Sequence, residues 1–494
     1  MEIKFVDLKK NFNSIKEEIF GNVNDLFNKC DFIGGESVKI FEANFAKYLG
    51  VKHFIGCANG TDALEIAIKM LNLENDDEII VQGNTYIATC LGALNNNNKL
   101  VLCDINEDTH QIDIESLESK ITSKTKAIIV VHLYGLMPDM DKIIEIVKKY
   151  NLFLIEDCAQ SHGAKWNGQM AGTFGDISCF SFYPGKNLGA YGDGGGIATN
   201  DDLLNERIRL TCNLGCKIKY QHDLIGRNSR LDTLQASFLN TKLTYLDNWN
   251  NTRRFNANLY CKFLKDVGDI KLPKVYEQCE PVYHLFVIKT KYRDQLQNYL
   301  KENKIDALIH YPISISETKA MDKYTFDKNE LTNCISNSKE ILSLPMYPEL
   351  EIWEIKYICD KINEFFLINN LTKVQNLKTD NKPGTLNCIN NIQFETKRFF
   401  YIKDIESLGK RGLHANLNFD EILIVIQGKI IIKTIDKQMT EKISELSEND
   451  IYFIPKMHWL EFEILDKDTI LLCLTNKIKE ESISENNFDK FKNI

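Results

Sequence analysis

The first two thirds of the chain alternate apolar runs of strand length with segments of helical periodicity. The runs are nearly continuous stretches of β-branched and aromatic residues, at 52–58, 77–83, 99–105, 126–135, 152–164 and 176–185. Strands of this kind separated by helices predict an α/β fold whose central, mostly parallel sheet is covered on both faces. Ligands of such sheets gather at the carboxyl ends of the strands, so the residues just past these runs are candidates for a site.

The rhythm changes after residue 366. Residues 367–390 are polar, rich in asparagine and contain Pro383-Gly384, which predicts a linker. Beyond it, short apolar strands follow one another with no helix of comparable strength between them, at 397–405, 421–435, 450–465 and 468–476. This pattern is typical of an all-β barrel or jelly roll. We therefore expect domains at 1–366 and 391–494, joined by the linker at 367–390.

Composition sets the broad class. The 494 residues are 44% hydrophobic and 26% charged, as in globular proteins, and the formal net charge of −9 argues against nucleic acid as the main partner. The start of the chain has no apolar leader, and nowhere do 18 apolar residues run together, so we expect a cytoplasmic protein without a membrane span. Fourteen cysteines without C-x-x-C pairs fit reduced, mostly buried thiols.

A lysine surrounded by glycines raises the question of chemistry. Lys186 lies in FSFYPGKNLGAYGDGGGI, residues 180–197. A phosphate-binding P-loop is excluded, because Phe180 stands where its first glycine should be and Asn187 replaces its hydroxyl residue. The remaining choices are a reactive amine or an ordinary surface lysine in a turn.

Three strand ends supply complementary groups. Asn59-Gly60-Thr61-Asp62 follows the run at 52–58, Asp157 ends the apolar part of the run at 152–164, and Lys186 follows the run at 176–185. A glycine turn before a helix can hold an anion, although the same residues also make a good helix cap. An anion site, a carboxylate and an amine on one sheet edge are what pyridoxal 5'-phosphate (PLP) requires: a phosphate cradle, a counter-ion for the pyridinium nitrogen and a Schiff-base lysine.

At this point the sequence resembles a family, the DegT-type sugar-nucleotide aminotransferases, which are fold type I PLP enzymes with a small C-terminal subdomain. The resemblance covers about residues 1–366 and rests on ordered motifs: FIGGESVKIFEANFAKYLG, ANGTDAL, GNTYIAT, VVHLYG, IEDCAQSHGA, the stretch at 180–197, GRNSRLDTLQA, YHLFVI, IHYP and LSLPMYPEL. Family members that dehydrate have histidine in place of the lysine, so Lys186 favours amino transfer.

The resemblance implies roles for individual residues. Lys186 corresponds to the Schiff-base lysine, Asp157 to the partner of the pyridine nitrogen and Gln160 to the neighbour of the ring hydroxyl. Tyr86 matches the aromatic residue that stacks on the ring. The phosphate ligands correspond to Gly60, Thr61 and Ser181.

Two further implications concern the assembly and the substrate. Asn228 in GRNSRL is similar to the residue that reaches the phosphate from the neighbouring subunit, which implies a homodimer with shared active sites. After IHYP the chain reads ISISETKAMDKY and lacks the Pro-x-His stretch that family members often carry near substrate. We assign no role to the histidines in matching motifs, since lone histidines are more often structural: His132, His162 and His284.

The stretch RGLHANLNFDEILIVIQG at 411–428 resembles the cupin-fold sugar-nucleotide 3,4-ketoisomerases, over about residues 391–475. His414 and Arg411 fall on matching catalytic positions, for a proton shuttle that requires no metal. The chain departs from the His-Ala-His-Lys pattern at Asn416, which cannot act as an acid or base, and has Glu421 in place of a later glutamine.

A metal-binding cupin is the competing interpretation of the barrel, since His414, Glu421 and His458 could serve as ligands. Asn416 removes one expected ligand, so we expect no metal. A barrel that only binds a nucleotide sugar or pairs subunits is a further alternative.

The fused order of activities suggests the reaction. A 3,4-ketoisomerase makes a 3-keto sugar that an aminotransferase can convert to a 3-amino sugar. We therefore expect a dTDP-linked 3-keto-6-deoxyhexose as substrate and L-glutamate as donor. The alternatives are amination at carbon 4 with a non-catalytic barrel, and a PLP-binding sensor without turnover.

Overall fold

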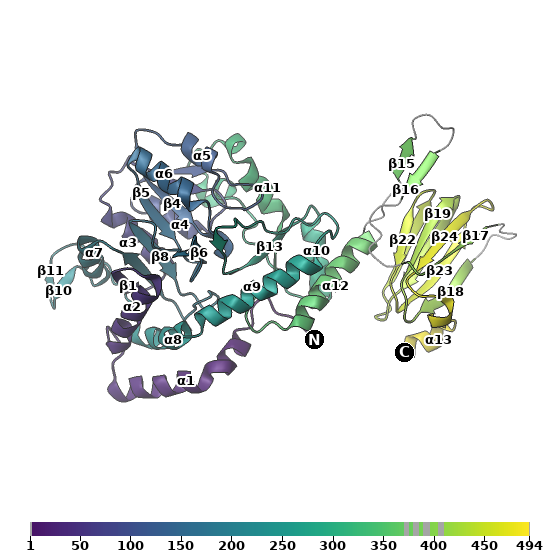
Figure 1. Cartoon of the computed structure of the whole chain (residues 1–494), viewed down its shortest axis with the longest axis horizontal. Helices are drawn as coiled ribbons and strands as arrows, with labels where there is room; N and C mark the ends of the chain where they lie inside the picture. The colour runs from purple at the N-terminus through teal and green to yellow at the C-terminus, as the bar shows by residue number, and fades with distance from the viewer. Residues whose placement is uncertain (1, 370–374, 379–384, 389–395, 404–409, 494) are drawn as a thin grey trace. The chain divides into compact units, whose positions relative to one another are not determined.

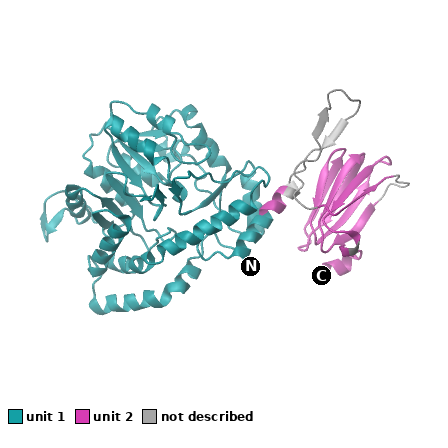
Figure 2. Cartoon of the chain, in the orientation of Figure 1, with its two compact units in different colours: residues 1–361 teal, residues 362–494 magenta. Residues whose placement is uncertain are grey.

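The structure is a computed structural model that describes residues 2–369, 375–378, 385–388, 396–403 and 410–493. The chain forms two compact units, residues 1–361 and 362–494 (Figure 2). No described helix combines the length and the apolar character needed to cross a membrane.

A seven-stranded sheet forms the centre of the first unit, in the order β1-β9-β8-β5-β4-β2-β3 (Figure 1). Its strands are β1 (His53–Cys57), β2 (Glu78–Gln82), β3 (Lys99–Cys103), β4 (Thr125–Val131), β5 (Phe153–Asp157), β8 (Ile177–Ser181) and β9 (Gly195–Thr199). The pairings among β3, β2, β4, β5 and β8 are parallel, whereas β9 is antiparallel to both of its neighbours. The predicted mostly parallel sheet is confirmed.

Both faces of this sheet are buried, as continuous apolar strands require. Along β4, Ile128 and Val130 belong to one core cluster, and Ala127 and Ile129 belong to the cluster on the opposite face. The α-helices of this unit up to residue 263 are α1 (Leu8–Lys29), α2 (Glu36–Leu49), α3 (Gly60–Met70), α4 (Ile87–Leu94), α5 (Ile114–Ser119), α6 (Met140–Tyr150), α7 (Asp202–Cys212), α8 (Thr233–Leu243) and α9 (Leu246–Phe263).

A smaller part of the unit follows α9. It contains the antiparallel pair β13 (Phe286–Lys289) and β14 (Ile341–Leu344), with α10 (Arg293–Glu302) and α11 (Thr332–Glu340). Short strands elsewhere are β6 (Lys165–Trp166), β7 (Gln169–Met170), β12 (Cys279–Glu280), β10 (Cys216–Ile218) and β11 (Gln221–His222).

The range predicted as a linker contains regular structure. Helix α12 (Ile352–Asn369) extends into it, and β15 (Gln375–Lys378) pairs antiparallel with β16 (Thr385–Cys388). Leu377 and Leu386 are register partners in this hairpin. The polar, asparagine-rich composition of the range gives no indication of these two strands. Pro383 and Gly384, on which the linker prediction partly rests, lie outside the described residues.

Two antiparallel sheets face each other in the second unit, so the predicted all-β fold is confirmed (Figure 1). We call this pair of sheets the barrel. One sheet contains β17 (Arg398–Ile402), β24 (Ile470–Thr475), β19 (Glu421–Gln427) and β22 (Ile451–Ile454). The other contains β21 (Glu441–Ser447), β20 (Lys429–Ile435), β23 (His458–Ile464), β18 (Lys410–Asn416) and β25 (Ser484–Glu485). The C-terminal α13 (Phe488–Asn493) buries Phe491 against Trp459.

Candidate active site

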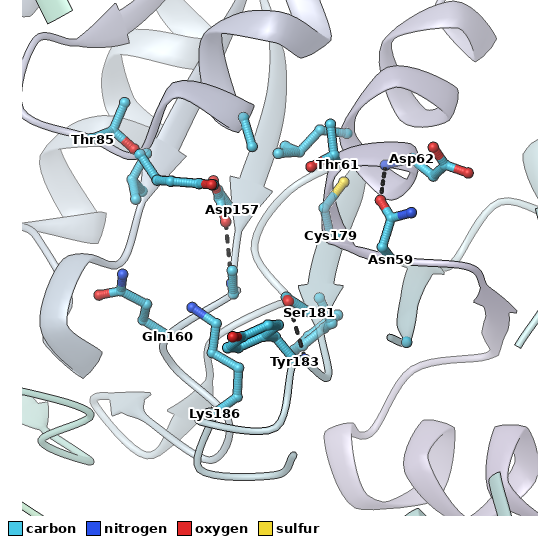
Figure 3. A pocket seen from close by; sticks show the side chains of 18 of the residues that line it. Asn59, Thr61, Asp62, Thr85, Asp157, Gln160, Cys179, Ser181, Tyr183 and Lys186 are labelled. Carbon is cyan, nitrogen blue, oxygen red and sulfur yellow. Dashed lines mark hydrogen bonds between the residues drawn. The ribbon is translucent and has the colours of Figure 1, made fainter. Parts of the chain in front are cut away.

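A cavity of about 720 Å³ opens at the carboxyl ends of the parallel strands (Figure 3). Of the site residues predicted for the first unit, all but one line it: Gly60, Thr61, Tyr86, Asp157, Gln160, Ser181 and Lys186. The sheet edge therefore brings together groups that are up to 126 positions apart in sequence, from Gly60 to Lys186.

Lys186 lies in the turn that follows β8. Its backbone N–H donates to the carbonyl of Tyr183 at 2.8 Å, and its side chain reaches into the cavity beside Gln160 and Asp157 (Figure 3). Loss of hydration lowers the pKa of the amine to about 8, although the negative charge of Asp157 acts in the opposite direction. A lysine with this pKa is partly neutral at physiological pH, and the neutral amine is the form that can act as a nucleophile or base.

Asp157 ends β5 and is buried. Burial raises the pKa of its carboxyl group, while hydrogen bonds from the Thr89 hydroxyl at 2.8 Å and the Ala159 N–H at 3.1 Å favour the charged form, as does the nearby Lys186. A buried carboxylate held by two donors is suited to accept a hydrogen bond from a cationic ring nitrogen.

The N-terminus of α3 forms one wall of the cavity. Asn59 caps this helix, because its side-chain oxygen accepts a hydrogen bond from the Asp62 N–H at 2.8 Å. A Cβ atom added to Gly60 would lie 2.7 Å from the Cβ of Ser181, so a larger residue would push the two apart. The first turn of the helix thus approaches Ser181 closely, and its N–H groups and dipole favour an anion there. The segment that caps the helix is therefore also the segment that can bind an anion.

Two aromatic residues and an amide also line the cavity. Gln160 accepts from the Tyr134 N–H at 2.6 Å and donates to the Tyr311 hydroxyl at 3.2 Å, so its orientation is fixed from both sides. Tyr86 is 56% exposed, and its ring centroid lies 5.6 Å from that of Tyr311. An exposed ring at the mouth of a polar cavity is available for stacking on a planar ligand.

Several groups at the site were not assigned a role from the sequence. Tyr311 follows His310 in the quoted IHYP motif, so a signal for it was present. Thr89 ends the GNTYIAT motif and lies inside α4, so a signal for it was also present, although the motif does not indicate its bond to Asp157. Asp193, in the glycine-rich stretch, also lines the cavity.

Asn228 does not line the cavity of its own chain. It is exposed and forms an isolated backbone bridge with Asn213. This position agrees with a residue that serves a neighbouring subunit, and that role stays a prediction.

Of the histidines without an assigned role, His132 and His162 are buried and His284 is half-buried. His132 lies 2.9 Å from the Glu156 carboxylate, which also accepts three backbone N–H bonds from the 172–175 loop. Burial, together with the charge of Lys186, lowers the pKa of His162 to about 3. His284 contacts the Asn187 side chain at 3.2 Å. These contacts are of the kind that core histidines make.

The barrel has its own cavity of about 660 Å³, lined by Arg411, His414 and Glu421 among others. Asn416 is fully buried and donates a hydrogen bond to the Glu421 carboxylate at 2.9 Å. His458 does not line this cavity.

Within the part of the chain that the structure describes, the one close group of potential metal ligands is His132, Glu156 and Cys158, in the first unit. The alternative of a metal site at His414, Glu421 and His458 gains no support from this geometry.

The lysine, carboxylate and helix N-terminus define an aminotransferase-type site, and comparison with known proteins agrees. The model of the DegT/DnrJ/EryC1/StrS aminotransferase family matches residues 13–363, so the chain belongs to that family. A second model, FdtA (WxcM-like, C-terminal), matches residues 368–494.

Individual relatives extend the picture. A dTDP-3-amino-3,6-dideoxy-alpha-D-galactopyranose transaminase from Aneurinibacillus thermoaerophilus is 44% identical over 363 residues, 74% of this chain and 99% of that protein. A "Pleiotropic regulatory protein" from Geobacillus stearothermophilus is 40% identical over 368 residues, 74% of this chain and 99% of that protein. NtdA from Bacillus subtilis, solved with bound cofactor PMP, superposes with a TM-score of 0.69 at 29% identity, covering 74% of this chain and 85% of NtdA.

The predicted family, fold class and PLP cofactor are thereby confirmed. The chain is a sugar aminotransferase of the DegT family with an additional C-terminal β domain.

Proposed function

We propose that the chain transfers the amino group of L-glutamate to carbon 3 of a dTDP-linked 3-keto-6-deoxyhexose. The observation that carries the proposal is the convergence of Lys186, Asp157 and the N-terminus of α3 on one cavity. The transaminase of Aneurinibacillus thermoaerophilus, whose name specifies a 3-amino dTDP sugar, supports the choice of carbon and nucleotide.

The residues of the cavity fit PLP. The close approach of Gly60 to Ser181 beside the start of α3 supplies a cradle for phosphate, with Thr61 as a further ligand. Asp157 would hold the proton on the ring nitrogen, Tyr86 would stack on the ring, and Gln160 would contact the ring hydroxyl. When bound, PLP supplies an aldehyde that carries the amino group and a ring that accepts electrons from the substrate.

Lys186 performs the proton transfers of the proposed reaction. With a pKa of about 8, the amine can accept a proton from the α-carbon of glutamate and deliver one to carbon 3 of the sugar. Histidine in its place would lack a primary amine and could not form the same covalent attachment.

The active sites are proposed to be shared within a homodimer. The exposed position of Asn228, outside its own cavity, supports a contribution to the phosphate site of a second copy. Shared sites would make cofactor binding dependent on dimer formation.

The barrel is proposed to convert the 4-keto sugar to the 3-keto sugar that the first unit aminates. Support comes from the match to the WxcM-like model and from a cavity that contains both Arg411 and His414. In the alternative, amination falls on carbon 4 and the barrel only binds the nucleotide sugar.

A second candidate function is a PLP-binding regulator without turnover. The name of the Geobacillus stearothermophilus relative favours it. The presence of both Lys186 and Asp157 in the cavity favours turnover.

One experiment separates these functions. The purified full chain with PLP is expected to show an absorbance band near the visible edge that L-glutamate bleaches and a keto-sugar nucleotide restores. The dTDP-linked 3-keto and 4-keto sugars are then supplied separately, and the product is analysed by NMR for the carbon that carries nitrogen. Failure to bleach would favour the regulator, and nitrogen at carbon 4 would contradict the proposed substrate.

A further inference from the structure

The barrel contains a buried carboxylate for which its fold has no evident need. Glu421 is the first residue of β19, and it is 4% exposed. Along this strand Leu423 and Val425 belong to the interior core, while Ile422 and Ile424 belong to the cluster on the other face. Because side chains alternate along a strand, Glu421 faces the interior with Leu423 and Val425. It ends an otherwise apolar row at the wall of the cavity.

No described ion pair neutralises this carboxylate: the salt bridges that the structure describes in the barrel involve other acidic residues. The Asn416 amide donates a hydrogen bond to it at 2.9 Å, and the Cys473 thiol is a second hydrogen-bond partner. Burial, the charge of Glu421 and this hydrogen bond together raise the pKa of the Cys473 thiol. Arg398 and Arg411 line the same cavity, but neither forms a described ion pair with Glu421. A buried carboxylate without such a pair is costly, and such groups are more often found where chemistry requires them.

Asn416 makes one described side-chain hydrogen bond, to Glu421. It is the last residue of β18 and 0% exposed, and within the described residues its side-chain oxygen has no hydrogen-bond partner. The bond from its amide to Glu421 joins strands that belong to different sheets, at the wall of the cavity. Asparagine cannot transfer protons near neutral pH, but it can hold a carboxylate in place.

His414 lies two residues before Asn416 on β18, and it lines the same cavity as Glu421. Its Nδ1 is 2.8 Å from the carbonyl oxygen of Gly412. A carbonyl can only accept, so Nδ1 carries the proton and Nε2 of the neutral ring is left as a base. The cavity therefore holds one imidazole base and one carboxylate.

We propose that Glu421 is a catalytic residue of the barrel, that it shares the proton transfers of 3,4-ketoisomerisation with His414, and that Asn416 is its positioning residue. This inference rests on the isomerase activity proposed above. It assigns to a carboxylate the second proton-transferring role, which Asn416 cannot fill.

The steps balance without an external oxidant or reductant. His414 removes the proton from carbon 3, the C–H electron pair forms the C3–C4 double bond, and the carbonyl pair moves onto the oxygen at carbon 4. Glu421 takes the hydroxyl proton from the oxygen at carbon 3 and delivers it to the oxygen at carbon 4. The carbonyl then forms at carbon 3, and His414 returns its proton to carbon 4. Carbon 3 is oxidised and carbon 4 is reduced.

The test uses the full chain without L-glutamate, so that amination cannot remove the product. The dTDP-linked 4-keto-6-deoxyhexose is incubated in deuterium oxide, and NMR follows deuterium at carbon 3 and formation of the 3-keto sugar. In Glu421→Gln we expect kcat for isomerisation to fall by about 100-fold or more, with little change in KM. Exchange at carbon 3 should fall less than product formation, since His414 is intact, whereas His414→Gln should lose both.

Companion variants separate chemistry from structure. Glu421→Asp should retain part of the activity, and Asn416→Ala should lower kcat about tenfold without raising KM. Glu445→Gln is the matched control, because Glu445 is an exposed glutamate of β21 outside the cavity, and it should isomerise like the unmodified chain. Amination of directly supplied 3-keto sugar should be unchanged in all these variants, and thermal unfolding followed by circular dichroism checks that the barrel is folded.

The outcomes are distinct. Unchanged isomerisation in Glu421→Gln would overturn the role of Glu421 and leave the proposed isomerase activity standing. No deuterium and no 3-keto sugar with the unmodified chain would refute the isomerase activity, and the inference with it.

Discussion

The hydroxyl of Thr89 donates a buried hydrogen bond of 2.8 Å to the carboxylate of Asp157. Thr89 is itself held by the hydroxyl of Thr85 at 2.8 Å, so a short chain of hydroxyl groups leads from the start of α4 to the end of β5. Burial raises the pKa of Asp157 and so disfavours its charged form. Each hydrogen bond donated to the carboxylate, including the one from Thr89, lowers this pKa.

Thr89→Val should make the aminotransferase more sensitive to acid. Removing the hydroxyl removes a bond to a charged group, so the already raised pKa of Asp157 should rise further. As pH falls through that pKa the carboxylate becomes neutral and can no longer keep the ring nitrogen protonated. We expect the acid limb of the kcat profile to move to higher pH, and kcat at neutral pH to fall about tenfold.

The matched control is Thr252→Val, which removes an exposed hydroxyl bonded only to its own helix at the Asn248 carbonyl. Its pH profile should overlay that of the unmodified protein. An unshifted acid limb in Thr89→Val would show that the bond to Asp157 does not tune the site.

Lys186→Met should stabilise the protein in the absence of cofactor. Burial lowers the pKa of this lysine to about 8 from 10.5, so the folded state holds the charged amine at a cost near neutral pH. Between about pH 8 and 10.5 the unfolded chain binds the extra proton, and stability of the unmodified protein rises with pH across that window. The advantage of Lys186→Met is therefore full below pH 8, about 3 kcal/mol, and disappears toward pH 10.5.

Urea unfolding of both proteins at pH 7 and pH 10, without PLP, measures this difference. The same variant should bind no PLP covalently and lose amino transfer. If the stability difference between Lys186→Met and the unmodified protein were the same at both pH values, packing and not the charge of the amine would cause it.

Most of the first unit could be predicted from local patterns. The runs at 52–58 and 152–164 contain β1 and β5. Gly60, just after the first run, and Asp157, the last residue of β5, both line the cavity. Parallel strands share a carboxyl edge, so strand ends alone locate such a site.

The remainder depends on contacts between distant segments. The bond from Thr89 to Asp157 spans 68 positions and joins a helix to a strand, so no periodicity announces it. The hydrogen bond from Asn416 to Glu421 could not be predicted either. The two residues are close in sequence, but their strands lie in different sheets. The antiparallel direction of β9 also follows from sheet order rather than from its own composition.

Gly60→Ala should weaken PLP binding while the fold persists. The added Cβ would lie 2.7 Å from the Cβ of Ser181, so the start of α3 must move away from the cradle. Overpacking of this kind costs about 1–3 kcal/mol, which corresponds to at least about a fivefold rise in Kd for PLP. Fluorescence titration of the cofactor-free protein measures the Kd.

Gly21→Ala provides the comparison, because nothing lies within 4 Å of a Cβ at that helical position. It should leave the Kd unchanged and, if anything, raise stability. Equal Kd values for Gly60→Ala and the unmodified protein would exclude a phosphate cradle at the start of α3.

Mixing two inactive variants should restore activity if active sites are shared. Lys186→Ala removes the reactive amine, and Asn228→Asp places a negative charge where the phosphate of the second copy is expected. In a mixed dimer, one site receives both changes and the other receives neither. Random reassociation makes half of the dimers mixed, so about a quarter of the unmodified activity should return.

The two variants are mixed under conditions that dissociate and then restore dimers, and amino transfer is measured as a function of the mixing ratio. Recovery should be greatest at equal amounts, because mixed dimers are then most abundant. If each site were built from one chain only, every site in the mixture would carry one of the two changes. Absence of recovery, with mixed dimers demonstrated by mass spectrometry, would therefore assign Asn228 to a role within its own subunit.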